Sequence, residues 1–276
     1  MRTERNEKGE NLFKWNYFDQ PMKVKGLIIG FFIAAMLSGC SAELKLAKSF
    51  TQQAKQTKVA VYFPEEATVT LVQDEEGSYT KVLDSLNQNA FLDLMYEAYA
   101  DGLRAYGMEV YIPENQNNVT VDSLHWMVLV SKVEIQGKFT DYVDQVFDYV
   151  DVYEFPFSLN TVNVASWFDI NNGEWLPTLY YEHNLMDGFS SKVTRRKDTG
   201  TQYHYDIRTL VNDDLYHYAV YLGKQYAAYT YDAMMNRYIA TELKKPNDML
   251  RFKLGYDPKR DEYYFMEEEE GFMEVQ

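Results

Sequence analysis

Four acidic residues, Asp141, Asp144, Asp148 and Asp151, recur at spacings of three, four and three in the segment "DYVDQVFDYVD". On a helix they would share one face, and carboxylates gathered in this way are ligands for calcium. Calcium-binding loops also need a glycine and main-chain carbonyl ligands in close sequence, which this segment lacks. We therefore expect either a solvated acidic face or a protruding acidic hairpin. A protruding hairpin would be a candidate partner-binding element.

The triplet "DTG" at Asp198 to Gly200 has the residues with which aspartic proteases activate water. That chemistry requires two carboxylates that share a proton, supplied by two copies of the motif or by a symmetric dimer. The chain has no second copy, and the flanking segments 190–196 and 201–207 have the composition of strands. We interpret the triplet as part of a hairpin turn.

Other candidates for catalysis also lack their partners. The segment "GFSSK" has Lys192 where a nucleophile elbow needs its second glycine. The histidines show no metal-ligand spacing; they are His125, His183, His204 and His217. We therefore expect a protein that is not an enzyme and that holds no metal or cofactor. A hydrolase remains as the least favoured alternative, with a noncontiguous site that joins two carboxylates, or a carboxylate with His204.

The composition is that of a globular protein, with 46% hydrophobic residues in a chain of 276. A formal charge of −15 disfavours nucleic acid as a partner, because phosphate binding depends on Lys and Arg. The same charge disfavours electrostatic adhesion to anionic lipid headgroups. The single cysteine excludes an internal disulfide.

That cysteine, Cys40, follows an apolar run from Leu27 to Leu37 that only Gly30 interrupts. A short basic segment at 22–25 precedes the run. Basic start, apolar run and small residues together are typical of a secretory signal. The run is too short to span a membrane, which takes roughly 20 apolar residues.

The tetrad "LSGC", formed by Leu37, Ser38, Gly39 and Cys40, resembles the lipobox of bacterial lipoproteins with a type II signal peptide, here of Bacteroidetes type. The resemblance implies that the signal peptidase recognises the first three residues and that Cys40 carries diacylglycerol. Two or more acyl chains anchor a protein stably, at about 0.8 kcal/mol per buried methylene. The alternative is a buried structural cysteine behind an N-terminal membrane helix.

Sorting follows from the residues after the cysteine. Ser41, where some lipoproteins have Asp, implies the outer membrane. Surface-exposed bacteroidete lipoproteins carry an acidic export signal, and only Glu43 is acidic in "SAELK", so we favour the periplasmic face over the cell surface. Residues 1–21 lie upstream of a complete signal that begins at Met22. We expect translation to start there; a genuine cytoplasmic extension from Met1 is the alternative.

Two "DSL" triplets resemble the O-glycosylation motif of bacteroidete envelope proteins, with Ser85 and Ser123 as candidate acceptors. The motif has only three residues, and chance explains either occurrence better than glycosylation does. Asn118 stands in an N-glycosylation sequon, whose use a bacterial lipoprotein gives little reason to expect.

The mature chain alternates strand-like and helical patterns. Residues 87–106 have apolar residues at four-and-three spacing, which predicts a helix that Gly107 ends. A longer helix is predicted over 213–241, with Asn212 as N-cap. Gly223, Ala227 and Ala228 on this helix would allow close approach to a sheet. Strands are predicted at 58–64, 67–73 and 108–113 and from 126 onward, with a two-residue hairpin turn at Asn172-Gly173.

This order of elements predicts an α+β fold, in which a mixed or antiparallel sheet is covered on one face by two helices. We expect residues 1–39 to be removed as overlong N-terminus and signal peptide. Residues 40–57 would be the lipidated cysteine and a tether or short amphipathic helix. A single domain would occupy 58–242, and 243–276 would be an acidic, mobile tail.

The element order is similar to that of auxiliary outer-membrane lipoproteins, and this resemblance implies a periplasmic adaptor. We therefore expect a non-enzymatic, membrane-anchored envelope lipoprotein that binds a protein partner or supports assembly or transport. The alternative is a glycan-binding lipoprotein that uses the tyrosine-rich segment 216–238 and "LYYEH" as an aromatic platform. Exposure of Tyr180, Tyr181, Tyr226 and Tyr229 together on one face would favour the platform; at helical spacing, aromatic residues are more often core.

Overall fold

The computed structural model describes residues 42–113, 119–122, 124–148, 151–196, 200–246, 253–266 and 273–275. The chain divides into two units, Met1–Glu43 and Leu44–Gln276, and the fold is that of the second. Several residues singled out in the sequence lie outside the described residues: Leu37, Ser38, Gly39, Cys40, Asn118, Ser123 and Asp198.

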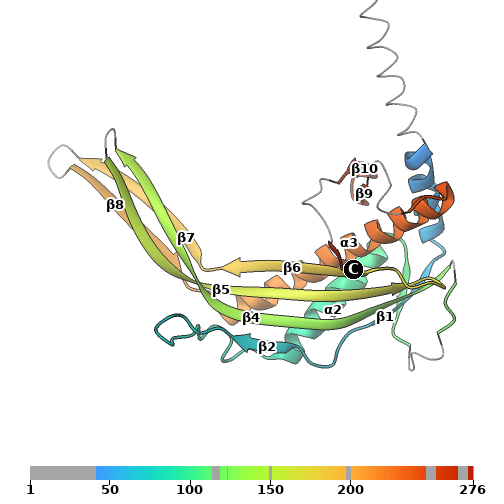
Figure 1. Ribbon diagram of the computed structural model, residues 1–276, viewed down its shortest axis with the longest axis horizontal. Coiled ribbons are helices and arrows are strands. Elements are labelled where there is room, and N and C mark those ends of the chain that lie inside the picture. The colour runs from blue at the N-terminus through green and yellow to red at the C-terminus, as the bar shows by residue number, and fades with distance from the viewer. Residues whose placement is uncertain are drawn as a thin grey trace, which may run out of the picture. The chain divides into compact units, whose positions relative to one another are not determined.

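A mixed sheet forms the centre of the second unit (Figure 1). Its strands follow the order β11-β6-β5-β4-β1-β3, and β2 also pairs with β4. The ladders of β1 and β2 are parallel, whereas those that join β4, β5, β6 and β11 are antiparallel. The strands are β1 (Lys58–Tyr62), β2 (Thr68–Leu71), β3 (Glu109–Tyr111), β4 (His125–Asp148), β5 (Asp151–Asn171), β6 (Thr178–Met186) and β11 (Met273–Val275).

Helices α2 (Gln88–Ala105) and α3 (Asn212–Leu243) cover one face of this sheet, as Figure 1 shows. The predicted α+β fold is therefore confirmed. Asn87 caps α2 by accepting a hydrogen bond from the Ala90 N–H at 3.1 Å, and Gly107 follows the helix with φ +92°. The predicted N-cap of α3 is wrong by one residue. Val211 is the N-cap, and the Asp214 carboxylate accepts from its backbone N–H.

Small residues bring α3 against α2, whereas we had expected them to bring it against the sheet; that prediction is wrong. A Cβ added to Gly223 would stand 2.2 Å from the Met95 carbonyl oxygen, and one added to Gly102 would stand 2.5 Å from Ala227 Cβ. The Tyr99 hydroxyl on α2 also donates to Thr230 on α3 at 3.0 Å. The two helices thus form one closely packed layer.

The hairpin of β4 and β5 extends past the rest of the sheet. The ladder with β2 ends at Gly137, and the ladder with β6 begins at Thr161. Beyond these points, 138–148 of β4 and 151–160 of β5 pair with each other. The acidic segment is therefore a hairpin and not a helix.

A second hairpin, β7 (Gly188–Arg196) with β8 (Gly200–Arg208), forms a two-stranded sheet of its own, as the sequence predicted. It contacts the extended part of β4 and β5 through aromatic side chains. We call residues 138–148, 151–160, β7 and β8 together the arm. In Figure 1 the arm continues the line of β4 and β5 away from the helices.

The fold uses residues on both sides of the expected domain. Residues 42–54 form a helix, one of the two forms expected for this segment, and Ala47, Phe50 and Ala54 are buried in the core. The strands β9 (Leu254–Asp257) and β10 (Glu262–Phe265) form a hairpin in the segment expected to be a mobile tail. The hairpin is held to α3, and Leu254 and Tyr256 are buried.

The turn after β5 is longer than the two residues predicted. Asn171 forms a bridge with Trp175, Gly173 adopts φ +105°, and β6 begins only after Pro177. The Asn171 side chain accepts a hydrogen bond from the Gly173 N–H at 2.8 Å, which stabilises the wider turn.

Candidate functional site

Aromatic side chains fill the interior of the arm. Because side chains alternate along a strand, Tyr153, Phe155 and Phe157 of β5 all face β7 and β8. Each such ring pair contributes roughly 0.5–1.5 kcal/mol beyond its buried area. The ring centroids lie 4.8–6.3 Å apart in the pairs Tyr142–Phe189, Phe157–Phe189, Phe157–Tyr205, Phe155–Tyr205, Phe155–Tyr203 and Tyr153–Tyr203.

Asp144, one of the four acidic residues of the sequence pattern, faces this interior. Burial raises the pKa of Tyr205 to about 12, and the neighbouring Asp144 carboxylate adds to the increase. The tyrosine hydroxyl therefore stays protonated at neutral pH. Asp141 is exposed on the other side of β4, so Asp141 and Asp144 lie on opposite faces of the hairpin and do not share one face as they would on a helix.

The opposite face of the β4–β5 part of the arm exposes apolar side chains. Val143 and Val152 are 47% and 51% exposed, although both residues belong to strands. Beside them, Gln145 donates a hydrogen bond to Glu154 at 3.0 Å. Exposed apolar residues rimmed by polar ones are typical of protein interaction surfaces.

The two hairpins of the arm carry opposite charge in sequence. Residues 138–160 contain one basic and five acidic residues, which gives a formal charge of −4. Residues 188–208 contain five basic and two acidic residues, which gives +3. The β4–β5 hairpin of the arm is therefore acidic, and the β7–β8 hairpin is basic.

A buried carboxylate at the base of the arm fixes where the chain leaves the sheet. Asp187, which is 6% exposed, lies between β6 and β7. Its oxygens accept from the backbone N–H of Asn160 and of Leu210, both at 2.8 Å, and from Asn160 Nδ2 at 2.7 Å. Because the carboxylate bonds the Asn160 N–H, it replaces the ladder bond that a continuing β6 would make.

A pocket of about 770 Å³ lies between the helical layer and the β9–β10 hairpin. Four tyrosine rings line it, those of Tyr106, Tyr256, Tyr263 and Tyr264. Charged residues of both signs stand around the rings: Asp101, Lys224, Asp257, Lys259, Arg260 and Glu262. Aromatic walls with a few polar groups are typical of small-molecule sites.

Two buried polar residues of α3 bind the β9–β10 hairpin, which lines this pocket. Asn236 accepts from the Leu254 N–H at 2.9 Å and donates to the Leu254 carbonyl at 2.8 Å. Asp232 accepts from the Tyr256 N–H at 3.1 Å. Burial raises the pKa of Asp232 well above its usual range, against the effect of the Tyr256 N–H and the Tyr264 side chain.

The tyrosines proposed as a platform do not lie exposed together. Tyr181 and Tyr226 are buried in the core with their rings 5.2 Å apart, and Tyr180 and Tyr229 are half-buried. The Tyr180 ring lies 5.0 Å from Trp167. The aromatic pocket is instead built largely from β9 and β10, a segment that the sequence analysis had assigned to the tail.

The histidines belong to separate elements, with His125 on β4, His183 on β6, His204 on β8 and His217 on α3. Within the described parts of the chain, no three His, Cys, Asp or Glu side chains are grouped to hold a metal ion. Burial lowers the pKa of His183, whose ring lies 6.2 Å from that of Tyr229.

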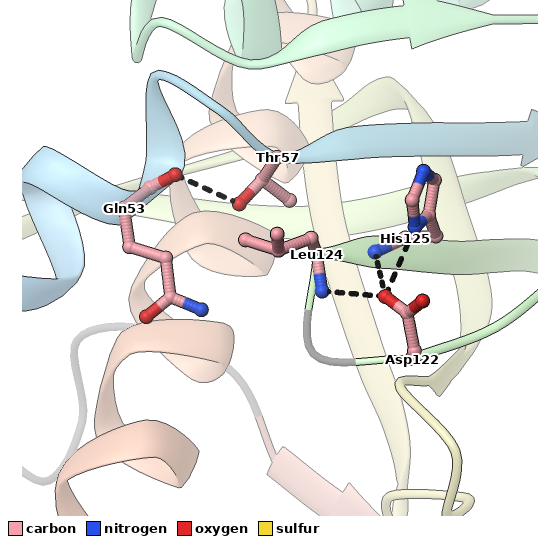
Figure 2. A network of polar contacts seen from close by, with 5 residues as sticks. All are labelled: Gln53, Thr57, Asp122, Leu124 and His125. Atoms are coloured by element: carbon pink, nitrogen blue, oxygen red, sulfur yellow. Dashed lines mark hydrogen bonds and ion pairs between the residues drawn. The ribbon is translucent and has the colours of Figure 1, made fainter.

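Figure 2 shows a network at the place where the helix of residues 42–54 leads into β1 and where β4 begins. One oxygen of Asp122 accepts from the backbone N–H of Leu124 and of His125 and pairs with the His125 ring at 3.0 Å. The hydrogen bond from the Leu124 N–H has the largest effect in lowering the pKa of Asp122, and the hydrogen bond with the His125 side chain lowers it further. Thr57 donates to the Gln53 carbonyl at 3.1 Å. The aspartate thus orders a turn, which accounts for the Asp–His pair without catalysis.

Of the two candidate glycosylation sites, Ser85 is described and exposed. Its hydroxyl and its carbonyl oxygen both accept hydrogen bonds from Asn212 Nδ2, at 3.0 and 3.1 Å. Asn212, the residue predicted as N-cap, thus ties the start of α3 to the loop before α2.

Among the described residues, no helix combines the length and the apolar character that crossing a membrane requires. No model of a protein family matches the chain, and no curated protein matches it significantly.

Proposed function

We propose that this protein is a lipid-anchored, non-enzymatic component of the bacterial envelope that binds a protein partner through its arm. The "LSGC" tetrad supports the anchor, with Cys40 as the acylated residue of an outer-membrane lipoprotein that faces the periplasm. Residues 41–43 alone separate Cys40 from Leu44, so the lipid would hold the folded unit close to the membrane surface.

The observation that carries the protein-binding role is the arm. Its strands are long, its outer face exposes Val143 and Val152, and its hairpin edges have main-chain groups outside any ladder of the described residues. An exposed strand edge is a ready template for another chain. Elements that serve the fold alone have no need of such a surface.

Affinity purification from envelope membranes tests this role. We compare the wild-type chain with a Val143→Lys, Val152→Lys variant, whose added charges make the apolar face of the arm unsuitable for a protein contact. The control, Asp93→Lys, adds a lysine on the exposed side of α2. The proposal expects a protein that copurifies with the wild type and with the control, and that is lost from the arm variant. Equal recovery with all three would contradict it.

The aromatic pocket supports a second candidate function, glycan binding. Tyrosine rings stack on the apolar faces of sugars, and the charged rim offers hydrogen bonds to hydroxyl groups. Tyr264, which is 45% exposed, is the most accessible ring of the pocket.

Affinity electrophoresis in gels that contain envelope polysaccharide measures this binding. Tyr264→Ala should abolish any retardation, whereas Tyr221→Ala, an exposed tyrosine of α3 outside the pocket, should leave it unchanged. Migration that no polysaccharide retards would remove the glycan function and would leave the protein-binding role intact.

A further inference from the structure

We infer that copies of this chain pair with each other through their arms, the β4 edge of one copy against the β7 edge of the next. The inference rests on the proposed function in one respect, that the arm is a protein-binding element. It names the partner as a second copy of the same chain.

The two edges have the backbone groups that such a contact needs. Beyond Gly137, the described ladders pair β4 with β5 alone, so residues 138–148 present one edge without a ladder. Strand β7 pairs with β8 alone, so its other edge is likewise without a ladder. Main-chain N–H and C=O groups along both edges are thus positioned for antiparallel or parallel pairing with another strand.

Charge disfavours the pairing of like edges. The β4 edge carries three aspartates against one lysine, Lys138, a formal charge of −2. The β7 strand carries Lys192, Arg195 and Arg196 without an acidic residue, a formal charge of +3. Pairing β4 with β7 brings opposite charges together, whereas pairing β4 with β4 or β7 with β7 brings like charges together and is disfavoured.

The fold of a single copy keeps these edges apart. The hairpins of one arm meet through the faces of their rings, Phe157 against Phe189 and Tyr205, and not through their edges. Asp187 holds this arrangement at the base of the arm, because its carboxylate takes the N–H of Asn160 on β5, to which a strand continuing from β6 would otherwise bond. The edges are therefore left for another copy to pair with.

A contact between two different edges is heterologous. Each copy then offers one β4 edge and one β7 edge. A single contact between two copies therefore leaves one β4 edge and one β7 edge unpaired. Such contacts build closed rings when the rotation between copies closes, and open chains when it does not. A dimer with two-fold symmetry forms instead if the two edges meet reciprocally, the β4 edge of each copy against the β7 edge of the other.

Charge reversal in the purified, full-length chain tests the pairing. Asp141 and Lys192 are both exposed and lie on the two edges. We expect the wild type to form species above the mass of one chain in light scattering, and high salt to weaken them. Asp141→Lys and Lys192→Asp should each raise the dissociation constant roughly tenfold or more, because each places like charges side by side. The double variant should recover most of this loss, and Asp93→Lys on α2, the same change of charge, should have no effect.

Disulfide trapping gives a second readout that does not depend on charge. Copies with Asp141→Cys, mixed with copies with Lys192→Cys, should form a mixed disulfide much faster than copies with Asp93→Cys do with the same partner. Circular dichroism of each variant shows whether it is folded. A wild type that remains a single chain at every concentration, or single reversals without effect, would overturn the pairing.

The two proposals fail in different ways. If the wild type copurifies with another envelope protein but never with itself, the protein-binding role stands and the pairing between copies is wrong. If the arm captures neither another protein nor a second copy, both are wrong.

Discussion

Gly223 shows how one missing methyl group sets the distance between the two helices. Its nearest neighbours, the Met95 carbonyl oxygen and Ala98 Cβ, belong to α2. The small residues of α3 predict a close approach, but we had expected it to be made to the sheet. Small residues in a helix indicate that another element packs closely against it, but only the structure shows which element this is.

Gly223→Ala should therefore destabilise the protein. The added Cβ would stand 2.2 Å from a backbone oxygen, which no rotamer change relieves, so the helices must separate. We expect the free energy of unfolding to fall by about 1–3 kcal/mol, measured by urea denaturation. Gly188→Ala is the matched control, since its Cβ would meet Arg208 Cβ at an ordinary 3.4 Å. Equal stability of both variants would contradict the tight contact.

The raised pKa of the buried Asp232 carboxyl predicts how the free energy of unfolding depends on pH. Its pKa is raised in the folded state, so above the usual aspartate pKa of about 4 the folded chain binds a proton that the unfolded chain has released. Its contribution to stability is therefore largest at low pH and is lost as the pH rises through the folded pKa.

Asp232→Asn should remove this dependence. The amide oxygen can still accept from the Tyr256 N–H, and no charge needs to be buried. At pH 8 we expect the variant to be more stable than the wild type by about 1 kcal/mol or more, with the difference shrinking toward pH 4. Thermal melts of both proteins across that range measure it, and parallel curves would show that the carboxyl is not responsible.

At the scale of elements, the sequence predicted most of what depends on local pattern. The four-and-three spacing and Gly107 place α2 within a residue of its observed ends, and the β7–β8 hairpin was expected. The segment at 141–151 remained open because aspartates at spacings of three and four suit a helix as well as a loop. Every second residue from Tyr142 to Val146 lies on one face of β4. This pattern indicates a strand only once Phe189 and Tyr205 are known to pack against that face.

The base of the arm could not be predicted from local pattern at all. Asp187 joins Asn160 and Leu210, which are distant in sequence, and a lone aspartate between two strand-like segments normally indicates a turn. The same reason explains the aromatic pocket, because its tyrosines come from the C-cap of α2, from β9 and from β10.

Asp187→Ala should loosen the arm where it leaves the sheet. The change leaves the N–H groups of Asn160 and Leu210 without their acceptor, at about 1–3 kcal/mol for each group that stays buried. Hydrogen exchange should become faster at these two amides and along β7, while α2 exchanges as before. Unchanged protection of both amides would show that the carboxylate does not hold the base of the arm.

At the scale of the whole molecule, the proposed anchor and the proposed role of the arm would define where and how the protein acts. Cys40→Ala removes the thiol that the proposed acylation needs. We expect the variant to lose its retention in the membrane fraction, because acyl chains and not surface charge would hold it there. Cell fractionation with immunodetection measures the distribution; a variant that stays with the membrane to the same extent would exclude Cys40 as the anchor.

The most direct measurement of the central claim is site-specific photo-cross-linking in intact cells. A photoreactive residue replaces Val143 on the outer face of the arm or, as control, Asp93 on α2. The proposed function predicts a discrete protein adduct, retained with the membranes, from position 143 and none from position 93. The absence of any adduct from position 143, or the same adducts from both positions, would contradict it.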